Sequence, residues 1–354
     1  MKKRILTFAA DRALVRNVSD AGLVVEPDLS TEDALAAVRD RGVAAILHAV
    51  GDAAADATIS RLRAEPAMDA VATVAILPRG TFGAAGLAFA SGADDVASAE
   101  ESPQLVRRLE AIAKGGAPAG PPMPAVVADP ERTRRTAFGR VLRRAGFDVR
   151  FAVETADLAS VPADGCVVAD TALAEDAAKS GAAAKGLWVI LADASETGRA
   201  RALTSAGRVA VHDRAAAIEN VLFHLNELGN PRAGNSRATP RVLWSAPVRW
   251  SVAGTDEGGW GVTFNVNKGG AYVRTLGSLP SGTEVWLELQ PDGADRRVHL
   301  EAKVVWCKPF GATTRPLAPA GMGMVFSDAT AADRTLFDAG YERLLRARTV
   351  ASAA

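Results

Sequence analysis

The chain has 354 residues, of which 48% are hydrophobic and 23% charged, and its 41 basic side chains balance 41 acidic ones. This length predicts two or three domains, each large enough to bury a core. A net charge of zero argues against bulk electrostatic binding to nucleic acid or to a membrane surface, because both require an excess of lysine and arginine. We therefore expect no nucleic-acid partner and no membrane insertion.

The sequence has no pattern that is typical of a catalytic or metal site. Cys166 and Cys307 are far apart and form neither a disulfide framework nor a metal-ligand spacing, and the four histidines have no such spacing either. We expect no catalytic residue, no metal and no cofactor, and therefore no enzymatic activity. The apolar run near the N-terminus is broken by Asp11 and Arg12, so it predicts no secretory signal, and we expect a cytoplasmic protein.

Two stretches rich in proline and glycine, GGAPAGPPMP (115–124) and GNPRAGNSRATP (229–240), predict linkers. They divide the chain into an N-terminal domain (1–114), a second domain (125–228) and a C-terminal domain (241–348). The second linker also contains the start of an arginine motif, described below.

The N-terminal domain alternates short apolar runs with helical patterns, which predicts a parallel sheet covered by helices on both faces. We expect strands at 4–9, 24–27, 44–50 and 73–77, and helices that begin near residues 12, 30 and 103. Ser30 is a natural N-cap for the second helix, with Asp33 in the capping-box position. The segment SGADDVAS (91–98) is typical of a turn.

The second domain repeats this scheme. We expect strands at 125–129, 147–152, 165–170, 187–192 and 208–212, a helix from about residue 132, and a last helix over 215–228. Both domains resemble the receiver domain of two-component response regulators. The resemblance implies a flavodoxin-like α/β fold with strand order 2-1-3-4-5.

The receiver resemblance also implies a phosphotransfer site, and the first domain has lost it. The family uses an acidic pair after the first strand, an acceptor aspartate after the third, a hydroxyl residue after the fourth and a lysine after the fifth. At the last three positions the first domain has His48, Pro78 and about Ala99, and only Asp11 remains near the metal site. Without an acceptor carboxylate, we expect a degenerate receiver.

The second domain keeps two of the family's carboxylates. Asp170 ends the third strand at the acceptor position, and Asp129 ends the first. The other positions have lost the family residues and hold Ala128, Ala192 and His212. Asp170 therefore has two interpretations: it caps a strand end beside Thr171, or it is a phospho-acceptor. A divalent cation needs several oxygen ligands, which favours the first interpretation.

The C-terminal domain changes to alternating apolar and polar residues, with runs at 242–250, 260–266, 269–275, 283–290, 297–306 and 321–326. Several short strands separated by Gly, Pro and Asp turns predict a small antiparallel β-barrel or sandwich. A helix over 330–347 follows, with Thr330 as N-cap and Asp333 in the capping-box position. Its apolar face fits one end of a barrel and consists of Leu336, Phe337, Leu344 and Leu345.

This domain resembles the PilZ family over about residues 237–347. The family's ligand signature is an RxxxR stretch before the first strand and a [D/N]xSxxG element after the second. Here Arg237-Ala-Thr-Pro-Arg241 and Asn265-Val-Asn267-Lys-Gly-Gly270 lie at these places, and Asn267 replaces the serine. The resemblance implies that the ligand is cyclic di-GMP.

The residue types suit that ligand. The planar fork of Arg237 or Arg241 can bond a phosphate or a guanine edge. The amides of Asn265 and Asn267 offer short donors and acceptors. Glycine lacks Cβ, so a ligand can approach the backbone N–H groups of Gly269 and Gly270.

These patterns predict a non-enzymatic signalling protein in which a PilZ-type domain binds cyclic di-GMP. The degenerate receivers would bind unidentified protein partners or form a homo-oligomer. The resemblance suggests outputs in bacterial motility, polarity or exopolysaccharide production. Two alternatives remain: a scaffold that no longer binds the nucleotide, which Asn267 favours, and a phospho-regulated receiver protein that uses Asp170.

Overall fold

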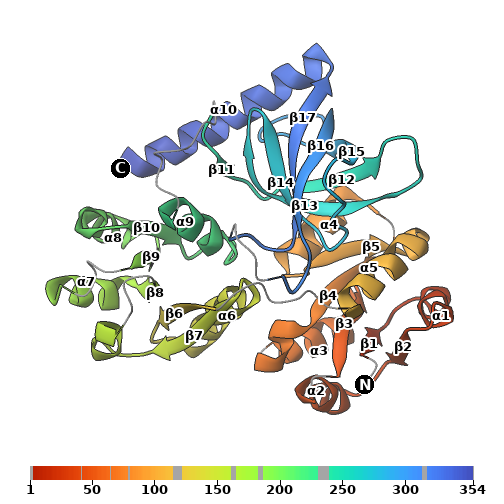
Figure 1. Cartoon of the computed structure of the whole chain (residues 1–354), viewed down its shortest axis with the longest axis horizontal. Helices are drawn as coiled ribbons and strands as arrows, with labels where there is room; N and C mark the ends of the chain where they lie inside the picture. Colours follow the sequence, from red (N-terminus) through yellow and green to blue (C-terminus); the bar gives the residue numbers. More distant parts are fainter. Residues whose placement is uncertain are drawn as a thin grey trace. The chain divides into compact units, whose positions relative to one another are not determined.

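The computed structural model describes residues 3–353 except 41, 64, 79, 115–121, 161–164, 182–185, 230–238 and 313–316. The chain forms two compact units. The first contains Met1–Gly116, Arg237–Phe310 and Ala320–Ala354, and the second contains Ala117–Ser236 and Gly311–Pro319. The first unit therefore joins the N-terminal α/β domain to the C-terminal barrel, and the second contains the other α/β domain (Figure 1).

The N-terminal domain has a parallel sheet in the order β2-β1-β3-β4-β5, which confirms the predicted flavodoxin-like topology. Its strands are β1 (Arg4–Phe8), β2 (Val24–Pro27), β3 (Val43–Ala49), β4 (Ala72–Leu77) and β5 (Asp95–Ser98). The central strands β3 and β4 are buried along almost their whole length, because helices cover both faces of the sheet.

Helices α1 (Arg12–Asp20) and α5 (Ser102–Lys114) pack on one face of this sheet, and α2 (Thr31–Arg39) and α3 (Ala53–Arg63) pack on the other. Helix α4 (Phe82–Ala90) packs beside β4 and β5. Ser30 caps α2 as predicted, since its hydroxyl oxygen accepts a hydrogen bond from the Asp33 N–H at 3.1 Å.

The prediction of a turn over 91–98 was wrong in part, because its second half is strand β5. This strand is only four residues long and starts with a charged residue, Asp95, which is fully buried. A carboxylate is seldom buried without a charged partner. The partner of Asp95 is Arg108 in α5, thirteen residues later, and no local pattern shows this pairing.

The second α/β domain has the same topology, in the order β10-β9-β8-β6-β7, which confirms the predicted repeat. Its strands are β6 (Met123–Ala128), β7 (Phe147–Ala152), β8 (Cys166–Asp170), β9 (Leu187–Ala192) and β10 (Val209–Asp213). Its helices are α6 (Arg132–Arg144), α7 (Thr171–Lys179), α8 (Thr197–Ala202) and α9 (Asn220–Gly229). The last helix begins at Asn220 and not at residue 215, because turns occupy most of 214–219.

The C-terminal domain is an antiparallel barrel, as predicted, and the pairing of β13 with β14 closes it. Its strands are β12 (Pro247–Val252), β13 (Gly258–Asn267), β14 (Gly270–Arg274), β15 (Glu284–Leu289), β16 (Val298–Lys308) and β17 (Gly321–Ala329). A short strand, β11 (Val242–Leu243), pairs with the end of β13. The predicted single strand over 242–250 is interrupted because the Thr263 hydroxyl donates to the Trp244 carbonyl and accepts from the Ala246 N–H.

Helix α10 (Ala331–Ala353) packs against the barrel, as Figure 1 shows. Phe337 is fully buried, and the predicted apolar face of Leu336, Leu344 and Leu345 lies against the barrel core. Thr330 accepts a hydrogen bond from the Asp333 N–H at 3.1 Å, which confirms the N-cap. Among the described residues, no helix is long and apolar enough to cross a membrane.

Candidate ligand site on the barrel

The hairpin turn between β13 and β14 carries the predicted asparagines. Asn267 pairs with Gly270, and its side-chain oxygen accepts a hydrogen bond from the Gly269 N–H at 3.0 Å. This bond is the usual way in which asparagine stabilises a tight turn. Asn265 lies two residues earlier in β13, opposite Leu243 and Tyr272, and only 7% of its surface is exposed.

The segment before β11 lies against this turn. The pairing of Val242 with Val266 places Arg241 beside Asn267. The Lys268 N–H donates to the Thr239 hydroxyl at 3.3 Å, and the Asn267 amide donates to the Thr239 carbonyl at 3.5 Å. The structure thus brings Arg241 to the predicted asparagines.

Arg237, the first arginine of the motif, lies outside the described residues. Most of the second predicted linker, 229–240, also lies outside them, apart from Gly229 at the end of α9 and the Thr239–Pro240 segment. Arg241 is half-buried.

The two predicted glycines have different surroundings. Gly269 is exposed, and a Cβ placed there meets no atom closer than the Asn267 side-chain oxygen at 3.7 Å. Gly270 is buried, and a Cβ there would collide with the Met324 carbonyl oxygen in β17. Glycine at 270 is therefore required by the close approach of two strands, and only Gly269 presents open backbone.

Helix α10 contributes residues that the sequence did not reveal. The Tyr341 hydroxyl donates to the Pro240 carbonyl at 2.8 Å. Lys268 pairs with Glu342 at 2.6 Å, and this hydrogen bond raises the pKa of Lys268. The Arg334 guanidinium donates to the Lys268 carbonyl at 3.0 Å. The turn and the preceding segment are both tied to α10, although about 70 to 100 residues separate them in the sequence.

The predicted phosphotransfer position of the first α/β domain has no carboxylate. His48 lies near the end of β3 and is buried, and burial together with the nearby Arg63 charge lowers its pKa to about 4. Asp11 caps α1, where its carboxylate accepts hydrogen bonds from the N–H groups of Ala13 and Leu14. Asp11 therefore stabilises a helix end, and His48 occupies a position in the core.

In the second α/β domain, arginines neutralise the two predicted carboxylates. Asp170 caps α7, accepting from the Ala172 N–H at 2.9 Å, and forms an ion pair with Arg214. Asp129 is fully buried and accepts a bidentate pair of hydrogen bonds from Arg134 at 2.6 and 2.9 Å. Among the described residues, no group of three metal-binding side chains is present. The geometry thus resembles helix capping more than a magnesium site.

Comparison with known families decides the identity of the barrel. The family model of the PilZ domain matches residues 235–343. Residues 235–343 are a PilZ domain. No protein of curated function matches the sequence of this chain.

Several solved structures are similar to parts of the chain. The PilZ domain of CeSA from a cellulose-synthesizing bacterium is 17% identical over 31% of this chain and 98% of that chain, with a TM-score of 0.22. The PilZ domain of YcgR from Escherichia coli, solved with c-di-GMP, is 13% identical over 34% of this chain and 99% of that chain, with a TM-score of 0.25. An orphan response regulator of H. pylori is 20% identical over 31% of this chain and 95% of that chain, with a TM-score of 0.25.

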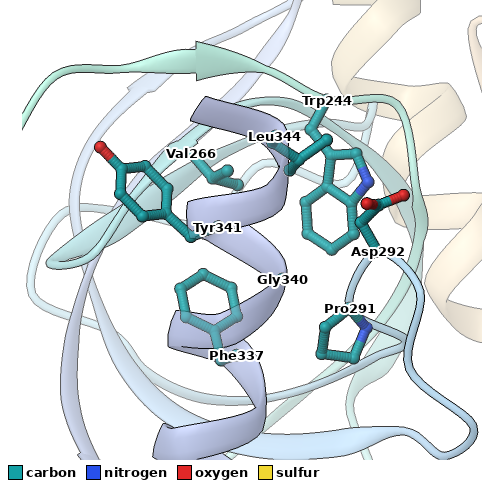
Figure 2. Close-up of a pocket in the computed structure, with 8 residues that line it drawn as sticks. All are labelled: Trp244, Val266, Pro291, Asp292, Phe337, Gly340, Tyr341 and Leu344. Atoms are coloured by element: carbon teal, nitrogen blue, oxygen red, sulfur yellow. The ribbon is translucent and has the colours of Figure 1, made fainter. Parts of the chain in front are cut away.

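A crevice between α10 and the barrel of the PilZ domain is too small to hold a dinucleotide. Figure 2 shows the residues that line it, which are Trp244, Val266, Pro291, Asp292, Phe337, Gly340, Tyr341 and Leu344. Even with the open space at its mouth included, the crevice contains only about 160 Å³.

Proposed function

We propose that the PilZ domain is a receptor for cyclic di-GMP and that the protein relays this signal by binding, without catalysis. The observation that supports this most directly is the pairing of β11 with β13, which places Arg241 beside Asn267. An arginine and a polar turn with an exposed glycine, Gly269, are thereby side by side on the barrel wall.

The proposed contacts follow from the chemistry of the ligand. Cyclic di-GMP has two phosphates and two guanines, and a guanidinium can bond either group through two parallel hydrogen bonds. Arg241 supplies one such group, and Arg237 supplies the second in this proposal. Asn265 and Asn267 offer amide groups for a guanine edge, and the open backbone at Gly269 allows close approach.

The test is a calorimetric titration of the full-length protein with cyclic di-GMP. Hydrogen bonds to charged groups each contribute about 1.5–3 kcal/mol, so Arg241→Ala and Arg237→Ala should each weaken binding by roughly tenfold to a hundredfold. Arg16→Ala removes an exposed charge from α1 and should leave the affinity unchanged. Equal affinities for all four proteins, or no heat with any of them, would exclude the proposed site.

A second candidate function is a scaffold that has kept the PilZ fold and lost the nucleotide. One contact favours it: the Asn267 amide donates to the Thr239 carbonyl at 3.5 Å. Asparagine is larger than the serine of the family signature, and this bond ties its side chain to the segment before β11. Asn267→Ser discriminates between the two candidates. Binding that appears only in this variant would support the scaffold.

In this proposal the two α/β domains bind partner proteins, and that binding depends on whether the PilZ domain has bound cyclic di-GMP. Cytoplasmic location is part of the same proposal. A ligand can shift such a protein only by its difference in affinity for two arrangements, so the docking must differ with and without cyclic di-GMP.

A further inference from the structure

The side chain of Arg108 in α5 reaches from the first receiver-like domain into the PilZ barrel. Its guanidinium donates to the Asp95 carboxylate at 3.3 Å within its own domain and to the Gly258 carbonyl of β13 at 3.0 Å. It also lies 5.6 Å from the centroid of the Trp250 ring. Only 5% of Arg108 is exposed, and so deep a burial of arginine requires the partners that it has here.

The barrel is shaped to receive this side chain. A Cβ at Gly259 would collide with the Arg108 guanidinium, and a Cβ at Gly277 would lie 2.7 Å from the Arg108 Nε atom. The Thr275 hydroxyl donates to the other oxygen of Asp95 at 3.3 Å. The buried ion pair is therefore completed by groups from the barrel, and both domains supply its hydrogen bonds.

Apolar residues around this ion pair form a core that the two domains share. Trp260 and Val262 of β13 are buried in one cluster with residues of β4 and α4, and the ring of Phe82 meets that of Trp260 edge to face at 5.0 Å. Leu276, beyond β14, is buried in the core that lies under α1 and α5. At the rim, Arg107 pairs with Glu257 at 3.1 Å.

We infer that the α4–β5–α5 face of the first receiver-like domain is a permanent interface with the PilZ barrel, so that these two domains unfold as one cooperative unit. Separating them would expose Trp260 and Val262 and would leave Asp95 without its complete set of partners. The face is therefore closed to an outside protein. This cooperativity is a property of the protein without ligand and does not depend on the proposed binding of cyclic di-GMP.

Hydrogen exchange of the full-length protein in increasing urea tests this inference, with peptides from β3 and β4 reporting on the receiver-like domain and peptides from β15 and β16 reporting on the barrel. Both sets should lose protection at the same urea concentration. Breaking a buried ion pair is costly, so Arg108→Ala should increase the open fraction of both sets by about 100-fold. Arg107→Ala, which removes a half-exposed rim pair, should change both by less than about fivefold.

Gly259→Ala provides an independent variant, because it obstructs the site of Arg108 from the barrel side and leaves every charge in place. It should also lower the protection of both domains together. If the receiver-like strands and the barrel strands of the wild-type protein open at clearly different urea concentrations, the inference is wrong. It is also wrong if Arg108→Ala affects only one of the two sets.

Discussion

The hydroxyl of Tyr341 donates a hydrogen bond of 2.8 Å to the carbonyl of Pro240, 101 residues earlier in the chain. Tyr341 is 2% exposed and Pro240 lies at the surface, so this bond is partly buried. Thr239, next to Pro240, is also bonded to the backbone of Lys268. The Thr239–Arg241 segment is therefore held between α10 and the hairpin turn.

Replacement of Tyr341 by phenylalanine should loosen this segment without changing the shape of the core. The Pro240 carbonyl would lose its partner, and a net loss of about 1 kcal/mol in the free energy of unfolding is expected. Amide exchange at Thr239 and Arg241 should become faster. Thr335→Val is the control, because that hydroxyl bonds only within α10, to Ala331. An unchanged exchange rate in Tyr341→Phe would show that the bond does not hold the segment.

The two glycines of the turn allow the fold and the ligand site to be separated. Gly270→Ala should destabilise the barrel by more than about 3 kcal/mol, because the new methyl group forces β14 away from Met324 in β17. Gly269→Ala should change stability by no more than about 0.5–1 kcal/mol, since its surroundings are open.

Thermal unfolding measures the difference in stability between the two variants. Titration with cyclic di-GMP measures the affinity of the folded Gly269→Ala variant. If the nucleotide approaches the backbone of Gly269, the alanine variant should bind more weakly although it is folded. Full affinity in Gly269→Ala would place the ligand elsewhere on the barrel.

Much of the architecture could be predicted because it rests on local periodicity. The parallel sheets follow from apolar runs that alternate with helical patterns, and the barrel follows from alternation between turns. The order of the strands was implied by the resemblance to receiver domains. Strand β5 was missed because its four residues include the charged Asp95, whose compensation by Arg108 exists only in three dimensions.

The candidate site, too, could be predicted only in part. The PilZ resemblance pointed to Arg241 and Asn267, and the β11–β13 register places these two residues side by side. No pattern could assign Gly270 to strand packing, because the colliding atom belongs to Met324, more than fifty residues away. The contacts of Tyr341 and the entry of Arg108 into the barrel likewise depend on how distant elements pack.

The structure also makes a prediction about Asp170. Its carboxylate is engaged by the α7 N-terminus and by Arg214, which is bonded to Glu196 as well. A small phosphodonor with Mg²⁺ should therefore leave Asp170 unmodified, because the metal would have to displace a bound guanidinium. Intact-mass measurement of the wild-type protein and of Asp170→Asn should show no phosphoryl addition in either. A phosphoryl group on the wild-type protein alone would restore the phospho-receiver interpretation.

The second α/β domain should lose stability in mild acid through His212. This side chain is 1% exposed, and its burial lowers its pKa from 6.5 to about 4. The negative charges of Asp213 and Glu219 act in the opposite direction but have a smaller effect on this pKa. The rings of Phe138 and His224 lie edge-on to it at 5.5 and 5.6 Å. Between these two pKa values the unfolded chain binds a proton that the folded domain excludes, so stability falls as the pH falls from 6.5 towards 4.

The contribution of His212 to this fall should approach about 1.4 kcal/mol per pH unit in the middle of that range. His212→Leu should remove that part of the slope, although it also changes packing at every pH. Urea unfolding of the second domain, at several values between about pH 7 and pH 4, measures the slope. His299→Gln, at an exposed position on β16, is the matched control. If His212→Leu and the wild-type protein lose stability with equal slopes, His212 is already charged in the folded domain, and burial does not suppress its protonation.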